Sequence, residues 1–301
     1  MHIAPDGDTI GSTLALYAAL RALGKRVQAV CQDRMPTVYG FLPNIREVLI
    51  PERAVKTENA IAIDCADADR MGRSRTLFEA ARSTMQIDHH STNTMFAARN
   101  KVDPSAAATG EIMYRIIFAL LDGRLPKDTA DCLYTAVLTD TGGFAHSNTT
   151  ENSFATAAEL MRFGIDPSEL SRLIYRTVSM PKTRLLGYAL SHIELFCSGS
   201  VGLCVISQAQ LGALHARSED TEGIIDHIRD IDTVQIAIFI RECLDGDYKV
   251  SLRSMDGVNI ATMAQNFGGG GHPCAAGFKI TMELDTLIDM LISSARELID
   301  A

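Results

Sequence analysis

The chain of 301 residues lacks several features that would assign it to a particular class of proteins. It has no run of about eighteen apolar residues, so no membrane span is predicted. No basic segment followed by an apolar one is visible near its start, so no signal peptide is expected. Its seven cysteines are scattered without a CxxC pair, which excludes zinc-finger spacing and favours reduced thiols over disulfides. These absences predict a cytoplasmic protein with no membrane partner.

Basic charge is also scarce. Lys and Arg number 28 against 37 Asp and Glu, for a formal net charge of −9. Binding of long duplex nucleic acid requires a broad basic surface, so such a partner is not expected. A small polyanionic substrate remains compatible, because bound divalent cations and a few well-placed arginines reverse the sign locally.

Strand-like and helical patterns alternate in the first half of the chain, which predicts parallel βαβ units. Strands are expected at 26–31, 47–50, 60–65 and 83–88. A second, smaller domain is predicted to carry strands at 201–206, 234–241 and 248–253, and the hairpin between the last two makes its sheet mixed. The fold class is therefore α/β, with a first domain at 1–180, a helical linker at 181–196 and a second domain at 197–301.

Two imidazoles and four carboxylates fall at the ends of predicted strands or helices, which is where α/β proteins place their chemistry. They are His2, Asp6, Asp8, Asp64, His89 and Asp140. Four carboxylates in one cleft repel unless they are neutralised, and two divalent cations would supply four positive charges. The mixture of His and Asp without Cys favours Mn²⁺. Taken alone, Asp6 and Asp8 are more typical of a turn and helix cap than of a metal site.

A second group of residues lies in the predicted smaller domain. Four successive glycines, Gly268 to Gly271, precede His272, and Arg253-Ser254 ends a predicted strand. A flexible turn is one explanation of the glycines. The other is close approach of the backbone to an anionic ligand, with amides and Arg253 as phosphate donors.

These motifs resemble, in order, those of the DHH phosphoesterase superfamily. The resemblance rests on His2-x-x-x-Asp6-x-Asp8, the Asp64 strand, Asp88-His89-His90 and Thr139-Asp140-Thr141-Gly142, and then on Arg253-Ser254 and Gly268-Gly269-Gly270-Gly271-His272 of a DHHA1 domain. It covers essentially the whole chain. The most similar branch is the NrnA type, which comprises oligoribonucleases (exonucleases of short RNA, or nanoRNA) that are also phosphatases of 3′-phosphoadenosine 5′-phosphate (pAp).

The resemblance implies a metal centre with two Mn²⁺ ions, bridged by Asp64. His2, Asp6 and Asp64 would hold one ion, and Asp8, Asp64, His89 and Asp140 the other. Asp88 would orient an imidazole, and His90 would face the phosphate. The substrate, a short single-stranded RNA or a nucleotide, would lie between the domains. Its further contacts would come from Arg253, Ser254, Gly270, Gly271 and His272, and a homodimer is compatible with this branch.

Two departures from the branch leave alternatives open. Family members normally carry a helix and most of a strand before the first His, whereas only Met1 precedes His2 here, so a truncated N-terminus is expected. The branch also usually has Arg-Tyr at the positions of Ala145-His146, so one phosphate contact is expected to be lost. The alternatives are a phosphodiesterase of linear or cyclic dinucleotides, or a catalytically impaired nucleotide-binding protein.

Overall fold

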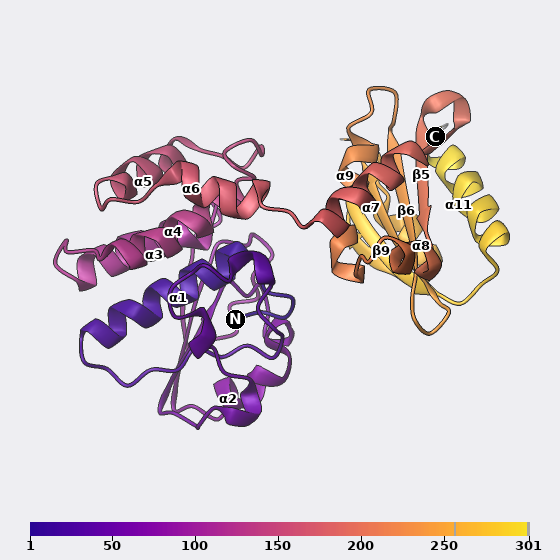
Figure 1. Ribbon diagram of the computed structural model, residues 1–301. Helices are drawn as coiled ribbons and strands as arrows, with labels where there is room; N and C mark the ends of the chain where they lie inside the picture. The colour runs from indigo at the N-terminus through magenta and orange to yellow at the C-terminus, as the bar shows by residue number, and fades with distance from the viewer. Residues whose placement is uncertain (256, 300–301) are drawn as a thin grey trace. The chain divides into compact units, whose positions relative to one another are not determined.

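The computed structural model describes residues 1–255 and 257–299, and these divide into two compact units, Met1–Thr177 and Val178–Ala301 (Figure 1). The first unit contains a parallel sheet in the order β1-β2-β3 among its described residues. Its strands are β1 (Asn59–Ile63), β2 (Ser83–Asp88) and β3 (Arg99–Val102). Its α-helices are α1 (Gly7–Ala22), α2 (Arg75–Glu79), α3 (Thr109–Leu120), α4 (Lys127–Asp140), α5 (Glu151–Met161) and α6 (Pro167–Ser171).

Toward the carboxyl ends of β1 and β2 both faces of this sheet are covered, and neighbouring residues of β1 point to opposite sides. Ile63 belongs to the apolar core shared with α1, α3 and α4, whereas Ala62 packs with Phe78 of α2. Figure 1 shows α2 well apart from the other three helices. Side chains alternate between faces along a strand, so the two successive buried residues Ala62 and Ile63 are typical of a strand covered on both sides at this end.

Helices α1, α3 and α4 pack unusually closely, because small residues lie where they cross. A Cβ on Gly11 of α1 would come within 2.3 Å of the Cys132 carbonyl oxygen of α4. One on Gly110 of α3 would come within 2.6 Å of the Ala136 side chain. This close packing fixes the N-terminal ends of α1 and α3 beside the sheet, and the Thr9 hydroxyl donates to the Ile63 carbonyl at 3.1 Å.

The second unit contains a mixed sheet in the order β4-β5-β6-β7-β9-β8 among its described residues. The strands are β4 (Glu194–Phe196), β5 (Val201–Ile206), β6 (Ile236–Glu242), β7 (Tyr248–Ser254), β8 (Gly270–His272) and β9 (Ala275–Ile280). The helices are α7 (Met180–Ser191), α8 (Gln208–Ala213), α9 (Ile224–Arg229), α10 (Ala261–Asn266) and α11 (Leu284–Ile299). Along β6, Ile238 packs with α10 and α11, and Phe239 packs with α7 and α9. Figure 1 accordingly shows α11 on one side of this sheet and α7 and α9 on the other.

The α/β fold class is confirmed, with a parallel sheet in the first unit and a mixed sheet in the second. Two local predictions are wrong. The strands expected at 26–31 and 47–50 reduce to a single bridge between Val30 and Leu49, with two backbone hydrogen bonds beside it, from the Cys31 amide to the Leu49 carbonyl and from the Leu49 amide to the Ala29 carbonyl. The linker expected to be helical over 181–196 is helical only as far as Ser191, and Glu194–Phe196 pairs with β5 as an edge strand. The predicted linker, 181–196, thus comprises α7 and β4, and Leu185 is fully buried in the second unit.

Short irregular helices complete the chain. Turns of 3₁₀ helix occur at Thr37–Tyr39, Ile45–Glu47, Pro51–Arg53, Asp69–Ser74, Cys197–Gly199 and Ser218–Thr221, and a π-helical turn at Arg172–Arg176. Among the described residues, none of the helices combines the length and the apolar character that crossing a bilayer requires.

Candidate functional site

Asp64 lies at the centre of the first unit's polar cluster, immediately after β1 ends. Its backbone φ of 58° is left-handed, a conformation that costs a non-glycine residue of order 1–3 kcal/mol and that concentrates at functional sites. The Asp64 amide donates to the Ile87 carbonyl of β2 at 2.9 Å, so the sheet itself holds this residue. The side chain is almost completely buried.

His2 and Asp6 approach Asp64 from one side. The His2 Nε2 atom lies 3.5 Å from Asp64 Oδ2 and 3.6 Å from Asp6 Oδ2. Its Nδ1 atom lies 2.7 Å from the Ile3 carbonyl oxygen, which makes Nδ1 the protonated nitrogen and leaves Nε2 as the ligand atom. These three residues form a group that is capable of holding a metal ion.

His89, Asp8 and Asp140 form a neighbouring group. The His89 Nε2 atom lies 3.3 Å from Asp140 Oδ2, 3.8 Å from Asp64 Oδ1 and 4.0 Å from Asp8 Oδ2. The other ring nitrogen, Nδ1, lies 3.2 Å from the Ala106 carbonyl oxygen. The structure therefore brings together all six residues that the sequence predicted as metal ligands, and Asp64 lies next to both groups.

The N-terminus of α3 supports this cluster in a way that the sequence did not predict. The amides of Thr109 and Gly110 donate to Asp8 at 2.6 and 2.9 Å, and the Ser12 hydroxyl donates to it at 3.0 Å. The Thr109 hydroxyl donates to Asp64 Oδ1 at 2.9 Å. Free amides at a helix N-terminus favour a negatively charged partner. Thr109 was not among the predicted site residues, and only the fold shows what it contacts.

His90 points differently from His89. Its Nδ1 atom lies 2.7 Å from Asp88 Oδ1, and Asp88 also accepts a hydrogen bond from Asn93 at 2.6 Å. Burial alone would raise the pKa of Asp88, but these two partners outweigh it and lower the pKa. The hydrogen bond to Asp88 also raises the pKa of His90. Asp88 is fully buried whereas the His90 side chain is 41% exposed, so only the imidazole is accessible to a substrate.

Electrostatics tests whether cations fit this donor set. Burial, followed by repulsion from Asp64, Asp140 and Asp6, raises the pKa of Asp8 well above its usual range. Burial also raises the pKa of Asp140 to about 6, with Asp64 and Asp6 contributing. Burial alone would lower the pKa of His2, but the hydrogen bonds to Asp6 and Asp64 outweigh this effect and raise the pKa to about 9. Without cations the cluster thus retains protons to offset its negative charge. Divalent ions would replace those protons, so the residues fit metal binding.

The segment after Asp140 contains the predicted departure at Ala145-His146. A Cβ on Gly142, whose φ is 56°, would come within 2.2 Å of the His146 Nε2 atom. The exposed imidazole therefore lies against this turn, just beyond Asp140.

In the second unit, Arg253 and His272 lie on the same face of the sheet. Both are register partners of Ala275, Arg253 from β7 and His272 from β8. The Arg253 Nε atom lies 3.8 Å from Asp226 Oδ1, and its Nη1 donates to the Leu252 carbonyl. Ser254, the next residue, faces the other way and is buried, and its hydroxyl donates to the Val258 carbonyl at 2.6 Å. The structure offers Arg253 and His272 to a ligand, but not the Ser254 hydroxyl.

Two neighbouring glycines of the glycine-rich segment, Gly270 and Gly271, differ in the space around them. A Cβ on Gly271 would come within 2.4 Å of the Ala275 carbonyl oxygen, so the close approach of β8 to β9 already requires glycine there. A Cβ on Gly270 would meet nothing within 4 Å. Of the predicted binding glycines, Gly270 is thus the one that leaves open space for a ligand.

Comparison with known proteins identifies the family. Residues 1–137 match the DHH family, N-terminal domain, and residues 206–297 match the DHHA1 domain. The bifunctional oligoribonuclease and PAP phosphatase NrnA of Thermus thermophilus is 34% identical over 98% of this chain and 88% of its own length. The chain belongs to the DHH family. It is therefore a hydrolase that acts on phosphoester bonds.

Two further relatives extend the comparison. The bifunctional oligoribonuclease and PAP phosphatase NrnA of Bacillus subtilis is 26% identical over 93% of this chain and 87% of its own length. Among solved structures, an exopolyphosphatase-related protein from Bacteroides fragilis superposes with a TM-score of 0.91 at 25% identity. That alignment covers 100% of this chain and 92% of the other. Together with the His and Asp groups described above, membership of this family indicates the use of a divalent metal.

Proposed function

We propose that the protein hydrolyses short oligoribonucleotides to mononucleotides and converts pAp to AMP, with two Mn²⁺ ions. The observation that carries this proposal is the pair of neighbouring groups that could each hold a metal ion, His2-Asp6-Asp64 and Asp8-His89-Asp140, with Asp64 Oδ1 3.8 Å from His89 Nε2. The names of the relatives from Thermus thermophilus and Bacillus subtilis supply the substrate class.

In this proposal His2, Asp6 and Asp64 hold one ion, and Asp8, Asp64, His89 and Asp140 hold the other. When bound, such a pair of ions activates water and neutralises the charge of the attacked phosphate. The protein's own contribution is to fix the ligands before the substrate arrives. Thr109 fixes Asp64, and the first amides of α3 fix Asp8. A ligand that is already oriented loses less entropy on binding.

His90 would bind the substrate phosphate. Its Nδ1 is committed to Asp88, which leaves Nε2–H as the donor when the ring is protonated. The hydrogen bond to Asp88 raises the pKa of His90, which favours the protonated form. Asp88, oriented in turn by Asn93, would act as a positioning residue for His90.

The second unit would bind the part of the substrate that does not react. Arg253 offers a planar fork of donors suited to phosphate, and His272 and Gly270 leave room beside it. Gly271 would support this surface by allowing β8 to lie close to β9, and Ser254 through the hydrogen bond of its hydroxyl to the Val258 carbonyl.

The test compares the wild-type chain with Asp64→Asn in the hydrolysis of pAp and of a five-nucleotide RNA, with Mn²⁺ present. Replacing a ligand should cost more than the roughly 10–100-fold typical of a residue that only orients one. Asp128→Asn, an exposed carboxylate in the same unit, serves as the control and should retain normal rates. Equal rates in Asp64→Asn and the wild type would refute the metal centre.

The same assay separates the alternative functions. A wild-type enzyme that cleaves linear or cyclic dinucleotides but neither pAp nor the longer RNA would be a dinucleotide phosphodiesterase. A wild-type protein that binds nucleotides in the presence of Mn²⁺ without hydrolysing any of them would be catalytically impaired.

A further inference from the structure

Three cations lie directly opposite one another on adjacent strands of the second unit. Arg241 of β6 pairs in register with Lys249 of β7, and Lys249 pairs with Lys279 of β9. Like charges directly opposite one another destabilise a sheet. Negative charge from another part of the protein or from a ligand would therefore stabilise this arrangement of three cations.

Only part of this charge is neutralised within the described residues. The Lys279 amino group lies 2.5 Å from Asp245 and 2.8 Å from Asp247 at the hairpin between β6 and β7. Arg241 and Lys249 have no carboxylate within 4.0 Å in the part of the chain that the structure describes. These two cations are available to an anion from outside the protein.

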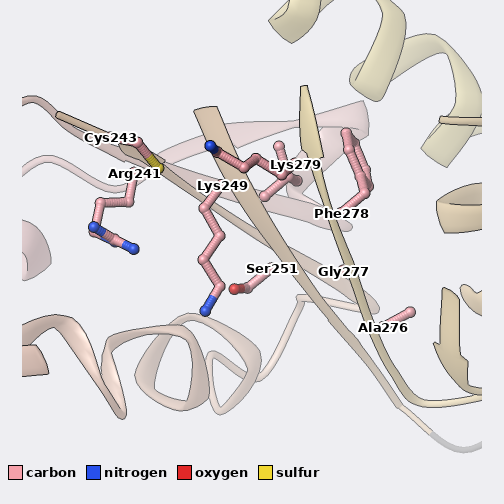
Figure 2. Close-up of a pocket in the computed structure, with 9 residues that line it drawn as sticks. Arg241, Cys243, Lys249, Ser251, Ala276, Gly277, Phe278 and Lys279 are labelled. Atoms are coloured by element: carbon pink, nitrogen blue, oxygen red, sulfur yellow. The ribbon is translucent and has the colours of Figure 1, made fainter. Parts of the chain in front are cut away.

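A hollow of about 620 Å³ opens on this face of the sheet. Its lining includes Arg241, Lys249, Ser251 and Gly277. Figure 2 shows Arg241, Lys249 and Ser251 on one side of the strands around it. Ser251 pairs in register with Gly277, which has no side chain to cover it. The hollow thus combines two free cations, a hydroxyl and an open floor.

The hollow continues the surface that carries Arg253. Lys249, Ser251 and Arg253 alternate along β7, so their side chains project from the same face, with about 6.7 Å between successive members. Arg253 and Lys249 therefore lie roughly 13 Å apart along the strand. A substrate held at Arg253 would reach Lys249 and Arg241 only if it extended further along β7.

We propose that Arg241, Lys249 and Ser251 form a subsite for an additional backbone phosphate of a single-stranded oligonucleotide. This inference rests on the proposed function and specifies which substrates gain from the second unit. pAp carries only two phosphates, one that reacts and one for Arg253, so it does not reach the subsite. The subsite thus favours RNA with three or more phosphates over pAp.

The test uses the double variant Arg241→Gln/Lys249→Gln, with Lys279→Gln as the matched control. KM for pAp and for a five-nucleotide RNA is measured with Mn²⁺ at low salt. The double variant should raise KM for the RNA about tenfold and leave KM for pAp unchanged. Because the variant removes two cations that bind phosphate, the slope of log affinity against log salt for the RNA should also become shallower by about 1.4. Lys279→Gln should change neither KM, because its charge is already neutralised.

Equal KM values in the double variant and the wild type, or equal increases for both substrates, would overturn the subsite. Binding of a fluorescent five-nucleotide RNA without metal provides a readout that does not depend on hydrolysis. If the wild type hydrolyses neither substrate, the proposed function fails. The subsite is then supported if the double variant binds this RNA about tenfold more weakly than the wild type, and refuted if the two bind equally.

Discussion

The two units present their functional residues in opposite ways. The first gathers His and Asp at the carboxyl ends of parallel strands, where Asp8, Asp64 and His2 are almost completely buried. The second spreads Arg253, His272, Lys249 and Arg241 over an accessible sheet face. In the first unit each group is held by several others, whereas in the second each cation has few partners or none among the described residues.

This difference predicts which kinetic or binding property each unit should control. Buried, mutually hydrogen-bonded ligands are fixed in place, and loss of one disturbs the others because the low local dielectric strengthens every interaction. Accessible cations act more independently and are screened by salt. Changes in the first unit should therefore lower metal affinity and kcat, and changes in the second should raise KM.

Among changes that leave the six predicted ligands intact, the largest effect is expected from Thr109→Val, which removes the hydroxyl that donates to Asp64. The loss of a group that orients a metal ligand typically costs about 10–100-fold in metal affinity or activity. Mn²⁺ affinity, measured by calorimetry, should fall by this factor while Tm stays close to that of the wild type.

Thr135→Val is the matched control for this change. Thr135 is also fully buried, but its hydroxyl has no hydrogen-bond partner within the described residues. It should keep wild-type affinity. Identical Mn²⁺ binding by the Thr109 and Thr135 variants would show that the contact with Asp64 does not matter.

A smaller effect is expected from a change of pH. Mn²⁺ affinity should change about tenfold per pH unit for each proton that the ion displaces. Without metal, the pKa of His2 is raised to about 9, so the ring carries a proton that a cation must displace. Mn²⁺ affinity should therefore rise with pH up to about 9 and then level off. Below about pH 6, Asp140 is protonated as well, and the dependence should steepen. Calorimetry in two buffers of different ionisation enthalpy should detect proton release at pH 7, and its absence would contradict this charge balance.

The smallest effect is expected from Arg253→Gln in the second unit. A hydrogen bond to a charged group contributes about 1.5–3 kcal/mol, and partial exposure reduces this, so KM for pAp should rise roughly tenfold with kcat nearly unchanged. Arg217→Gln, an exposed arginine of the same unit, is the control. A fall in kcat without a change in KM would indicate that Arg253 acts on the reacting groups instead.

The sequence predicted the first site better than the second for a physical reason. Carboxyl ends of parallel strands meet at one edge of a sheet, so the alternation of strands and helices is enough to predict that Asp64 and His89 lie together. The contact between Thr109 and Asp64 joins residues 45 positions apart. It depends on how closely α3 packs, which periodicity does not reveal.

In the second unit, predicting the binding residues required knowing which face of a strand each side chain occupies, and not only where the strand lies. The predicted strand at 248–253 agrees with β7 (Tyr248–Ser254), but sequence reasoning assigned Ser254 to the ligand, although its side chain is buried on the other face. Strand alternation could have separated Ser254 from Arg253. The pairing of Arg241 with Lys249 requires the register of the hairpin, which its turn did not specify.

The most direct test of the two-metal account is a crystal structure with Mn²⁺, using anomalous scattering to locate the ions. The account predicts two peaks about 3.5–4 Å apart, both in contact with Asp64, one beside His2 and the other beside His89. A single peak that does not touch Asp64, or none among the six ligands in crystals that contain Mn²⁺, would contradict it.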